Sequence, residues 1–273
     1  MTTTLRPTAP ERRDPDGRRS RSYDICVNSR PVGRIDLATD ARFGPAFGRI
    51  ARLAVDERDR HRGRGTVALL AAEEVLRGWG CGQVAVSVPA DATAALGLVG
   101  ALGYTERSRT MAKRLGTAPG LPAGSVARPM DEDDFERWQA GAKAGYVQDL
   151  VDRGVPRDTA EAEADRDHAS ALPRGQASPG AVFRVLAHDG ADVGTLWVML
   201  RDTGAFVFDV EVGEPFRGRG HGRALMHVAE HEGLAAGART IGLKVFAGNA
   251  PALRLYESLG YRPTEYHLYK PLL

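Results

Sequence analysis

The sequence carries one pattern twice at a fixed spacing, and this repeat limits the possible folds more than any other feature. Arg60-His61-Arg62-Gly63-Arg64-Gly65 matches Arg217-Gly218-Arg219-Gly220-His221-Gly222, an offset of 157 residues (217 minus 60). Leu102-Gly103-Tyr104 and Leu259-Gly260-Tyr261 are separated by the same number. A constant offset over a whole unit indicates a tandem duplication. The 273 residues, 42% of them hydrophobic, are enough for two domains.

Each copy alternates strand-like and helix-like segments. In the second copy, strands are predicted over residues 181–187, 193–200, 205–212, 240–246 and 266–270, and helices over 223–236 and 250–259. Such alternation favours a mixed α/β sheet flanked by helices. The expected fold class is therefore α/β, with two domains of the same type.

The copies differ in what precedes this core. In the second copy, Asp131 or Asp134 can cap a helix, and another helix is predicted from Pro156 to about Leu172. The first copy has no room for either helix and is truncated at its N-terminal end, where it begins with strands. The predicted organisation is a disordered basic tail (1–20), a degenerate first domain (21–115), a linker rich in Gly, Pro and Ala (116–124) and a complete second domain (125–273).

The charge balance selects no class of partner. The formal net charge is +2, no stretch reaches eighteen apolar residues, and the N-terminus has no apolar secretory segment. We therefore expect a cytoplasmic protein without a membrane segment. Its arginine-rich tail is interpreted as a solvated extension rather than a nucleic-acid contact. Cys26 and Cys81 are expected to be free thiols in a reducing compartment.

The glycine loop of the second copy has the features of an anion site. It lies between a predicted strand and a predicted helix, so the first N–H groups of that helix are unpaired and point at one spot. Gly220 and Gly222 allow a tight turn and a close approach to a ligand. Arg217, Arg219 and Arg223 add charge suited to phosphate oxygens. The spacing of the glycines fits neither the NTPase P-loop nor the dinucleotide-binding fingerprint. A pyrophosphate group is the expected ligand.

A second motif follows the loop. The segment from Asn249 to Tyr261 has the form N-x-x-A-x-x-L-Y-E-x-x-G-[FY], and Val210 to Gly222 reads V-x-V-x4-R-G-x-G-x-G. Together these motifs resemble the GNAT superfamily of acyl-CoA N-acyltransferases. The resemblance covers residues 125–273 fully and 22–115 partly. The layout is similar to that of mycothiol synthase-like tandem proteins, in arrangement only.

The resemblance implies roles for particular residues. Val210 to Val212 would hold the pantetheine arm of coenzyme A through free backbone groups, and the loop with Arg223 would bind the pyrophosphate. Asn249 would hydrogen-bond the pantetheine or the reacting region, and Ala252 belongs to the same cofactor-binding motif. Tyr256 would donate a proton to the departing thiolate, since a phenol with a pKa of about 10 can do so.

The general base is less defined. Positions where family members often carry Glu or His hold Phe206 and Phe208. Asp209 and Glu211 are nearby, yet strand alternation places them on the opposite face unless a bulge intervenes. We select Glu211 as the base, with a water relay or a residue of the preceding helices, such as Asp149, as alternatives.

The first copy lacks the residues that carry chemistry. By the constant offset, Ala92 replaces Asn249 and Val99 replaces Tyr256. Its loop is retained, and the positions of a possible second coenzyme A site are Val55, Arg60, Gly63, Gly65 and Thr66. We expect this copy to be catalytically inactive, whether it binds coenzyme A or serves as a scaffold.

The expected function is transfer of an acetyl group from acetyl-CoA, a co-substrate, to the amine of a small molecule or peptide, without a metal and by a monomer or homodimer. A non-catalytic acyl-CoA sensor is the main alternative, and retention of Asn249 and Tyr256 in one copy argues against it. A zinc metallopeptidase is a remote alternative, because His227, Glu230 and His231 match H-x-x-E-H.

Overall fold

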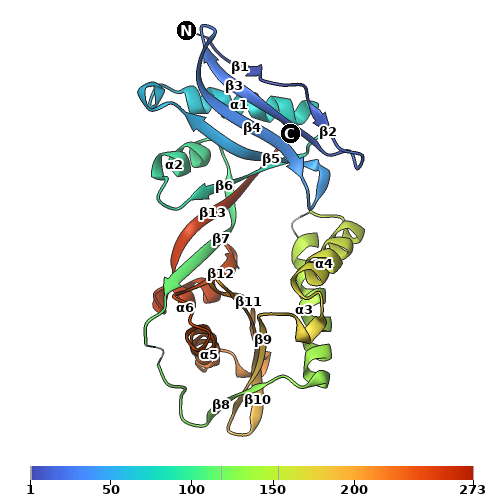
Figure 1. Ribbon diagram of the computed structural model, residues 1–273, viewed down its shortest axis with the longest axis vertical. Helices are drawn as coiled ribbons and strands as arrows, with labels where there is room; N and C mark the ends of the chain where they lie inside the picture. Colours follow the sequence, from blue (N-terminus) through green and yellow to red (C-terminus); the bar gives the residue numbers. More distant parts are fainter. Residues whose placement is uncertain (1, 118, 153, 273) are drawn as a thin grey trace. The chain divides into compact units, whose positions relative to one another are not determined.

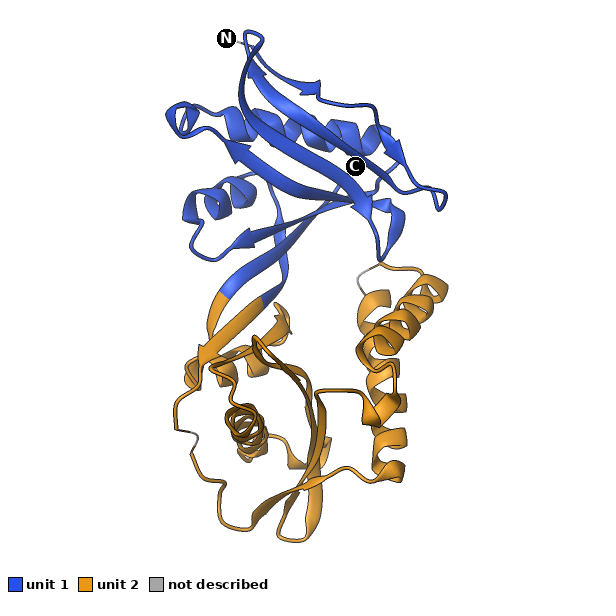
Figure 2. Ribbon diagram, viewed as in Figure 1, with its two compact units in different colours: residues 1–109, 264–273 blue, residues 110–263 orange. Residues whose placement is uncertain are grey.

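A computed structural model describes residues 2–117, 119–152 and 154–272. The chain forms two compact units, coloured separately in Figure 2. Unit 1 contains residues 1–109 and 264–273, and unit 2 contains residues 110–263. Both are mixed α/β structures, as the sequence predicted.

Unit 1 is built on a sheet with the strand order β1-β3-β4-β5-β6-β13. Its elements (Figure 1) are β1 Thr3–Pro7, β2 Arg12–Arg13, β3 Arg19–Val27, β4 Arg30–Asp40, β5 Gly44–Val55, the 3-10 turn η1 Glu57–Asp59, α1 Arg64–Gly78, β6 Gln83–Pro89 and α2 Thr93–Ala101. The β13 strand, Arg262–Pro271, completes this sheet. Helix α1 buries Leu69 and Leu76 against Ile25 and Ile35 of the sheet.

Unit 2 is built on a sheet with the order β7-β12-β11-β10-β9-β8. Its elements are β7 Thr105–Arg114 (whose residues 105–109 are counted with unit 1), β8 Ser125–Pro129, α3 Glu132–Val151, α4 Arg157–Ala171, η2 Gly175–Ala177, β9 Ala181–His188, β10 Ala191–Arg201, β11 Gly204–Val212, η3 Glu214–Phe216, α5 His221–Ala235, β12 Thr240–Phe246 and α6 Ala250–Ser258. The predicted strand over residues 240–246 has these same bounds, and the other predicted elements agree within about three residues, except that β13 begins four residues earlier.

The two faces of the unit 2 sheet carry different helices (Figure 1). Leu225 of α5 packs with Leu196 and Leu243 in one hydrophobic cluster. Trp138 of α3 packs with Trp197 on the other face. The sheet therefore separates the glycine-loop helix from the two helices that precede the core.

The start of α3 is fixed by the predicted cap. The Asp131 side chain accepts a hydrogen bond from the Asp134 backbone N–H at 2.8 Å, and the Asp134 side chain accepts one from the Asp131 N–H at 3.3 Å. This capping box satisfies two backbone donors at the helix start. Helix α4 begins directly after Pro156, also as predicted.

The N-terminal segment differs from its prediction. Residues 1–20 were expected to be disordered, but β1 pairs with β3 in antiparallel register, for example Leu5 with Ile25. Leu5 also packs against the unit 1 core. The sequence did not indicate this strand because the segment is short and polar, with Arg6 and Thr4 pointing outward and Leu5 as its only large apolar residue.

The domain boundaries also differ from their prediction. Each half of the sequence was expected to form its own domain, yet β13 pairs with β6 in unit 1, for example Tyr266 with Val88. In unit 2, the neighbour of β12 is β7, which begins at Thr105 in the first half of the sequence. Each unit therefore takes its terminal strand from the other copy.

Cys26 and Cys81 are both buried free thiols that form no disulfide with each other, as expected. Among the described residues, no helix is long and apolar enough to cross a membrane.

Candidate active site

The sheet of unit 2 opens where β11 and β12 part. The parallel ladder between them runs from Ala205–Ile241 to Val207–Leu243, whereas β11 continues to Val212. On its other side β11 remains paired with β10, up to Gly194–Val212. In the described residues, the backbone of Val210–Val212 is therefore not paired with β12, as expected for a strand that holds a pantetheine arm.

The glycine loop leads from this opening into α5. Gly218 and Gly220 have φ angles of +77° and +89°, in the left-handed region that favours glycine. Gly220 is the N-cap of α5, so the first helical N–H groups follow it directly. The Arg217 Nε donates to the Val212 carbonyl oxygen at 3.1 Å and closes the loop. The helix begins two residues earlier than predicted, which makes His221 its first residue.

Gly222 brings α5 close to α6. A Cβ atom at this position would lie 3.2 Å from Leu255 Cδ2, tighter than ordinary contact. The close approach places the loop next to the helix that carries Asn249 and Tyr256. The two sequence motifs are thus neighbours in space.

Exposed arginines surround the start of α5. Arg217, Arg219 and Arg223 are exposed. An Arg223 Nη donates to Ser258 Oγ at 2.7 Å, which directs that side chain along α6. This concentration of positive charge at a helix N-terminus suits a phosphate ligand.

Asn249 has a structural role that the sequence reading missed. It is the N-cap of α6, and its side-chain oxygen accepts a hydrogen bond from the Ala252 N–H at 3.1 Å. Ala92, the equivalent residue of the first copy, occupies an N-cap without a side-chain hydrogen bond. Cap preference was the available signal, since asparagine is favoured at this position.

Tyr256 lies on α6 with 6% of its surface exposed. Burial, and next the negative charge of Asp209, raise the pKa of Tyr256 to about 12. The phenol is therefore protonated at neutral pH and is a proton donor rather than a base.

A β-bulge in β11 decides which face carries Asp209. Trp197 of β10 pairs with Asp209, and the next residue, Val198, pairs with Val207, so Phe208 is the extra residue. The bulge breaks the alternation expected for this strand. Phe208 stacks on Trp197 at 4.5 Å between ring centroids, and Asp209 lies on the same face.

Asp209 is the most perturbed carboxyl group near Tyr256. Its Oδ2 accepts a hydrogen bond from Trp138 Nε1 at 2.7 Å. Burial raises the pKa of Asp209, and the neighbouring charge of Glu211 raises it further, against the lowering effect of the Trp138 hydrogen bond. Glu211, the base selected from the sequence, is exposed two residues further along the strand.

The first copy keeps the cofactor geometry without these groups. Its β5–β6 ladder ends at Ile50–Val86, the equivalent of Val207–Leu243, and Arg60 Nε donates to the Val55 carbonyl at 3.0 Å. Gly63 has a φ of +73° and caps α1, on whose first turn Gly65 and Thr66 lie. The equivalent of Asp209 is Arg52, on a strand with the same bulge. The first copy thus has Arg52, Ala92 and Val99 where unit 2 has Asp209, Asn249 and Tyr256, while its loop keeps Arg60, Gly63 and Gly65.

The H-x-x-E-H segment is arranged differently from a zinc site. Both carboxylate oxygens of Glu230 accept hydrogen bonds from Lys113 Nζ, at 2.8 and 2.9 Å. In the described part of the chain, no group of three His, Cys, Asp or Glu side chains could hold a metal ion.

Comparison with known proteins agrees with this geometry. The model of the acetyltransferase (GNAT) family matches residues 2–104 and 147–261. The chain belongs to this family, and the two matches show a tandem protein.

Relatives support the same assignment. The uncharacterized N-acetyltransferase YycN of Bacillus subtilis (strain 168) is 28% identical over 151 residues, covering 53% of this chain and 96% of that protein. The mycothiol acetyltransferase of Corynebacterium glutamicum is 40% identical over 62 residues, 23% of this chain and 21% of that protein.

Two solved structures share the fold along most of the chain. A GCN5-related N-acetyltransferase from Sphaerobacter thermophilus has a TM-score of 0.61 at 21% identity. The matched region is 92% of this chain and 80% of that protein's chain. A tandem GNAT protein from the clavulanic acid biosynthesis pathway has a TM-score of 0.54 at 17% identity, and the matched region is 96% of this chain and 85% of that protein's chain.

Proposed function

We propose that unit 2 transfers the acetyl group of acetyl-CoA to an amine nitrogen, with Asp209 as general base and Tyr256 as general acid. The geometry that supports this most directly is the β-bulge at Phe208, which places the Asp209 carboxyl beside the open end of β11, where its charge raises the pKa of Tyr256. Glu211 is retained as the alternative base, because it follows on the same strand.

The proton transfers follow from the two pKa directions. Asp209 accepts a proton from the acceptor ammonium, and its raised pKa makes it a stronger base than an ordinary carboxylate. The free amine attacks the thioester carbonyl, and the C–S bond breaks as the tetrahedral intermediate collapses. Tyr256 gives its proton to the departing sulfur. The attacking nitrogen releases its second proton to solvent as the amide forms, and solvent returns a proton to the Tyr256 phenolate after the thiol has left.

The co-substrate would be held by the motifs that the fold brings together. The backbone of Val210–Val212 would bind the pantetheine arm, and the N-terminus of α5 with its arginines the pyrophosphate. Ala252 lies in the first turn of α6, where its N–H is already used by Asn249. The Asn249 amide N–H₂ takes no part in that bond and can face the co-substrate.

The surroundings of Asp209 favour an acceptor with a flat apolar body. Phe208 is 40% exposed although it is a large hydrophobic residue, and it stacks on Trp197. The ring also has the Arg201 guanidinium 5.7 Å from its centroid, so its exposed part is what the ring of an arylalkylamine could contact, while the Asp209 carboxylate attracts the ammonium group. Small-molecule amines of this kind are the proposed acceptors, ahead of peptides.

The test is a thiol-release assay with acetyl-CoA and a panel of amines, with mass spectrometry of the products. Asp209→Asn should lower turnover by about 10²-fold, the lower end of general acid–base effects, and Tyr256→Phe should lower it by at least about tenfold. Coenzyme A affinity should stay within about twofold in both variants. Asp202→Asn, an exposed acid in the β10–β11 turn, is the matched control.

Unchanged turnover in Asp209→Asn would transfer the base role to Glu211 or to a water relay. The absence of turnover with every amine, combined with tight coenzyme A binding, would favour the acyl-CoA sensor instead.

A further inference from the structure

Helix α3 contacts the proposed general base through the side chain of Trp138. The indole Nε1 of Trp138 donates a hydrogen bond to Asp209 Oδ2 at 2.7 Å, between residues 71 positions apart in the sequence. Helix α3 lies on one face of the unit 2 sheet (Figure 1), and the bulge at Phe208 brings Asp209 to that same face. The contact therefore depends on the helix and on the bulge together.

The position of the Trp138 side chain is fixed by packing. The side chain is buried, and its ring centroid lies 5.0 Å from that of Phe183 on β9 and 5.4 Å from that of Trp197 on β10. Closely packed aromatic rings of this kind leave little room for a change of rotamer. The indole N–H is therefore held at one place relative to the sheet.

The start of α3 is anchored one helical turn before Trp138. The Arg128 guanidinium, on β8, pairs with the Asp134 carboxylate at the start of the helix and with Asp192 of β10, the latter at 2.7 Å. Asp134 is also a member of the capping box that begins the helix. These contacts tie α3 to two strands of the sheet that carries Asp209.

Trp197 provides a comparison within the same site, because it is also buried beside Asp209. It is the residue opposite Asp209 in the ladder between β10 and β11. Its Nε1 is buried and has no hydrogen-bond partner among the described residues. Of the two indoles, that of Trp138 is the one that donates to the carboxyl group, so the contact is not a general result of aromatic packing.

The hydrogen bond from Trp138 is the main interaction that favours the ionised form of Asp209. Burial raises the pKa of Asp209 most, and the charge of Glu211 on the same strand raises it further. The Trp138 N–H and the Val210 backbone N–H lower this pKa, because they bond to the carboxylate. On α6, Tyr256 is a neutral phenol. Among the described residues, no lysine or arginine forms an ion pair with Asp209.

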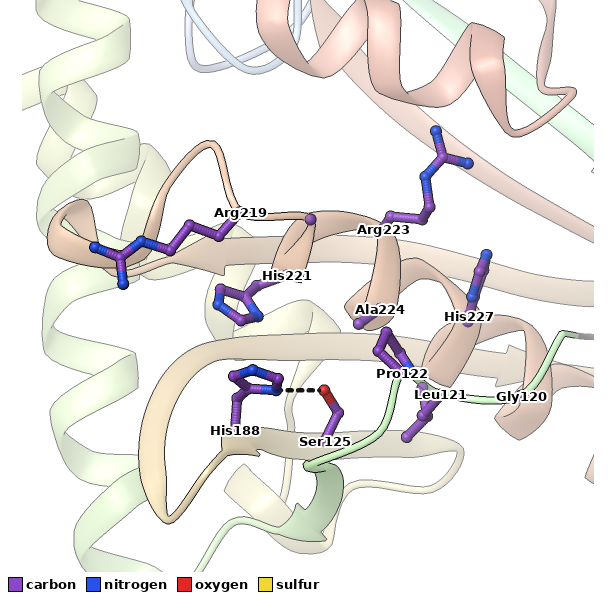
Figure 3. Close-up of a pocket in the computed structure, with 11 residues that line it drawn as sticks. Gly120, Leu121, Pro122, Ser125, His188, Arg219, His221, Arg223, Ala224 and His227 are labelled. Atoms are coloured by element: carbon purple, nitrogen blue, oxygen red, sulfur yellow. Dashed lines mark hydrogen bonds between the residues drawn. The ribbon is translucent and has the colours of Figure 1, made fainter.

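Histidines are the other groups of unit 2 that titrate near neutral pH. His168 of α4 stacks on Trp138 with 6.5 Å between ring centroids, and burial lowers the pKa of His168. His188, His221 and His227 surround the start of α5 (Figure 3), and burial lowers the pKa of the last two. Because the sheet separates α5 from α3, His168 is the histidine whose titration must be distinguished from that of Asp209.

The first copy has neither partner of this contact. In the described part of unit 1, strands β1, β2 and β3 follow one another without a helix like α3. The residue equivalent to Asp209 is Arg52, which pairs across the ladder with Asp36. The helix and the carboxyl group therefore occur together, in the copy that has Tyr256.

We propose that Trp138 is a positioning residue for the general base: its indole N–H holds Oδ2 of Asp209, which leaves Oδ1 to take the proton of the acceptor ammonium. The inference rests on the proposed function, since it takes Asp209 as the base. A carboxyl group held through one oxygen keeps its other oxygen in a fixed direction, as proton transfer to it requires.

The first test observes the hydrogen bond directly, without an activity assay. The full chain has three tryptophans, so its ¹⁵N–¹H spectrum has three indole signals. The Trp138 signal, assigned by its absence in Trp138→Phe, should move with pH in one step as Asp209 ionises. Asp209→Asn should abolish this step, and His168→Gln should keep it. The Trp197 signal, whose N–H has no partner, should move less.

The second test measures kcat/KM for acetyl transfer against pH. Loss of a hydrogen bond to a carboxylate raises the pKa of that group, so Trp138→Phe should move the acid limb of the profile to higher pH by about one pH unit. Trp197→Phe is the matched control, because it removes an indole N–H that has no partner, and the midpoint of its acid limb should match that of the wild-type protein. Coenzyme A affinity should stay within about twofold in Trp138→Phe.

A Trp138 signal that does not follow Asp209, or an acid limb that does not move in Trp138→Phe, would overturn the proposal. If thermal melts show that Trp138→Phe does not fold, Trp79→Phe and Trp197→Phe assign the Trp138 signal by elimination, and its step in wild-type protein and Asp209→Asn decides. A failure of the proposed function looks different. The step is then present while no amine is acetylated, which removes the positioning role and leaves the hydrogen bond.

Discussion

Lys113 of β7 places its ammonium group 2.8 and 2.9 Å from the two carboxylate oxygens of Glu230 in α5. Glu230 is 2% exposed, so the ion pair is largely removed from water. Unit 1 repeats the arrangement at the constant offset, where Lys270 lies 3.0 and 2.8 Å from the oxygens of Glu73. In both units the lysine comes from the strand supplied by the other half of the sequence.

Lys113→Met should therefore destabilise unit 2, because it leaves the Glu230 charge buried and unpaired. Breaking a fully buried pair costs about 3–5 kcal/mol, and partial exposure of the lysine reduces the expectation to roughly 2–3 kcal/mol. Chemical denaturation measures the change. Lys143→Met removes the exposed pair with Asp165 and should cost under about 1 kcal/mol. Similar losses in both variants would contradict the role assigned to burial.

Asp209→Asn should stabilise the protein at neutral pH while it lowers activity. The folded pKa of Asp209 is raised above the unfolded value, so its contribution to stability is complete below the unfolded pKa and is lost as the pH rises through the folded pKa. Asparagine keeps an acceptor for Trp138 and has no such loss. Urea unfolding at about pH 4 and pH 8 should show a gain for the variant only at the higher pH. A loss at both values would mean that the carboxylate is a structural requirement.

Arg217→Ala and Arg60→Ala form a matched pair, because each arginine donates a hydrogen bond to the carbonyl oxygen of the valine that precedes its glycine loop. We expect one coenzyme A molecule per chain, since unit 1 has the acids Asp56 and Asp59 where unit 2 has Gly213 and Phe216, and Asp59 pairs with Arg64 of the loop. Arg217→Ala should weaken binding by about tenfold, and Arg60→Ala should leave it unchanged. A titration that reaches two molecules per chain would instead support the second site.

Phe208→Ala tests the proposed acceptor class. Loss of the exposed ring should lower kcat/KM for arylalkylamines by about tenfold, as expected when one stacking contact is lost. The value for a short aliphatic amine should change by less than about twofold. Steady-state assays with both amines give the comparison. Equal losses would show that the bulge, rather than the ring, is what the reaction requires.

The fold and the cofactor loop could be predicted because both rest on local patterns. The glycine turns and the cap of α3 each involve residues within a few positions of one another, and the repeat is recognised by matching residues at one constant offset. The bulge at Phe208 could not be predicted, since it depends on how β11 pairs with β10. It changed the base under consideration from Glu211 to Asp209. Internal comparison offered a hint, because Arg52 shows that Asp209 was replaced along with Asn249 and Tyr256.

Other differences arise from distant pairing. Strand β1 lies in an arginine-rich segment and carries a single large apolar side chain, Leu5, so composition alone indicated a tail. The exchange of β7 and β13 also cannot be detected in the sequence, because the two strands occupy equivalent positions in the two copies. An offset identifies equivalent strands and does not say which sheet each one joins.

The placement of β13 in unit 1 has a consequence for the order of synthesis. Strand β6 ends at Pro89, and its antiparallel partner begins to pair at Glu265. A ribosome adds about 5–20 residues per second, so the nascent first unit waits roughly 9–35 s for its last strand. During that interval the β6 edge is open to any other extended chain. Polysomes, where several nascent copies are held close together, are therefore the setting in which this protein is most exposed to pairing between chains.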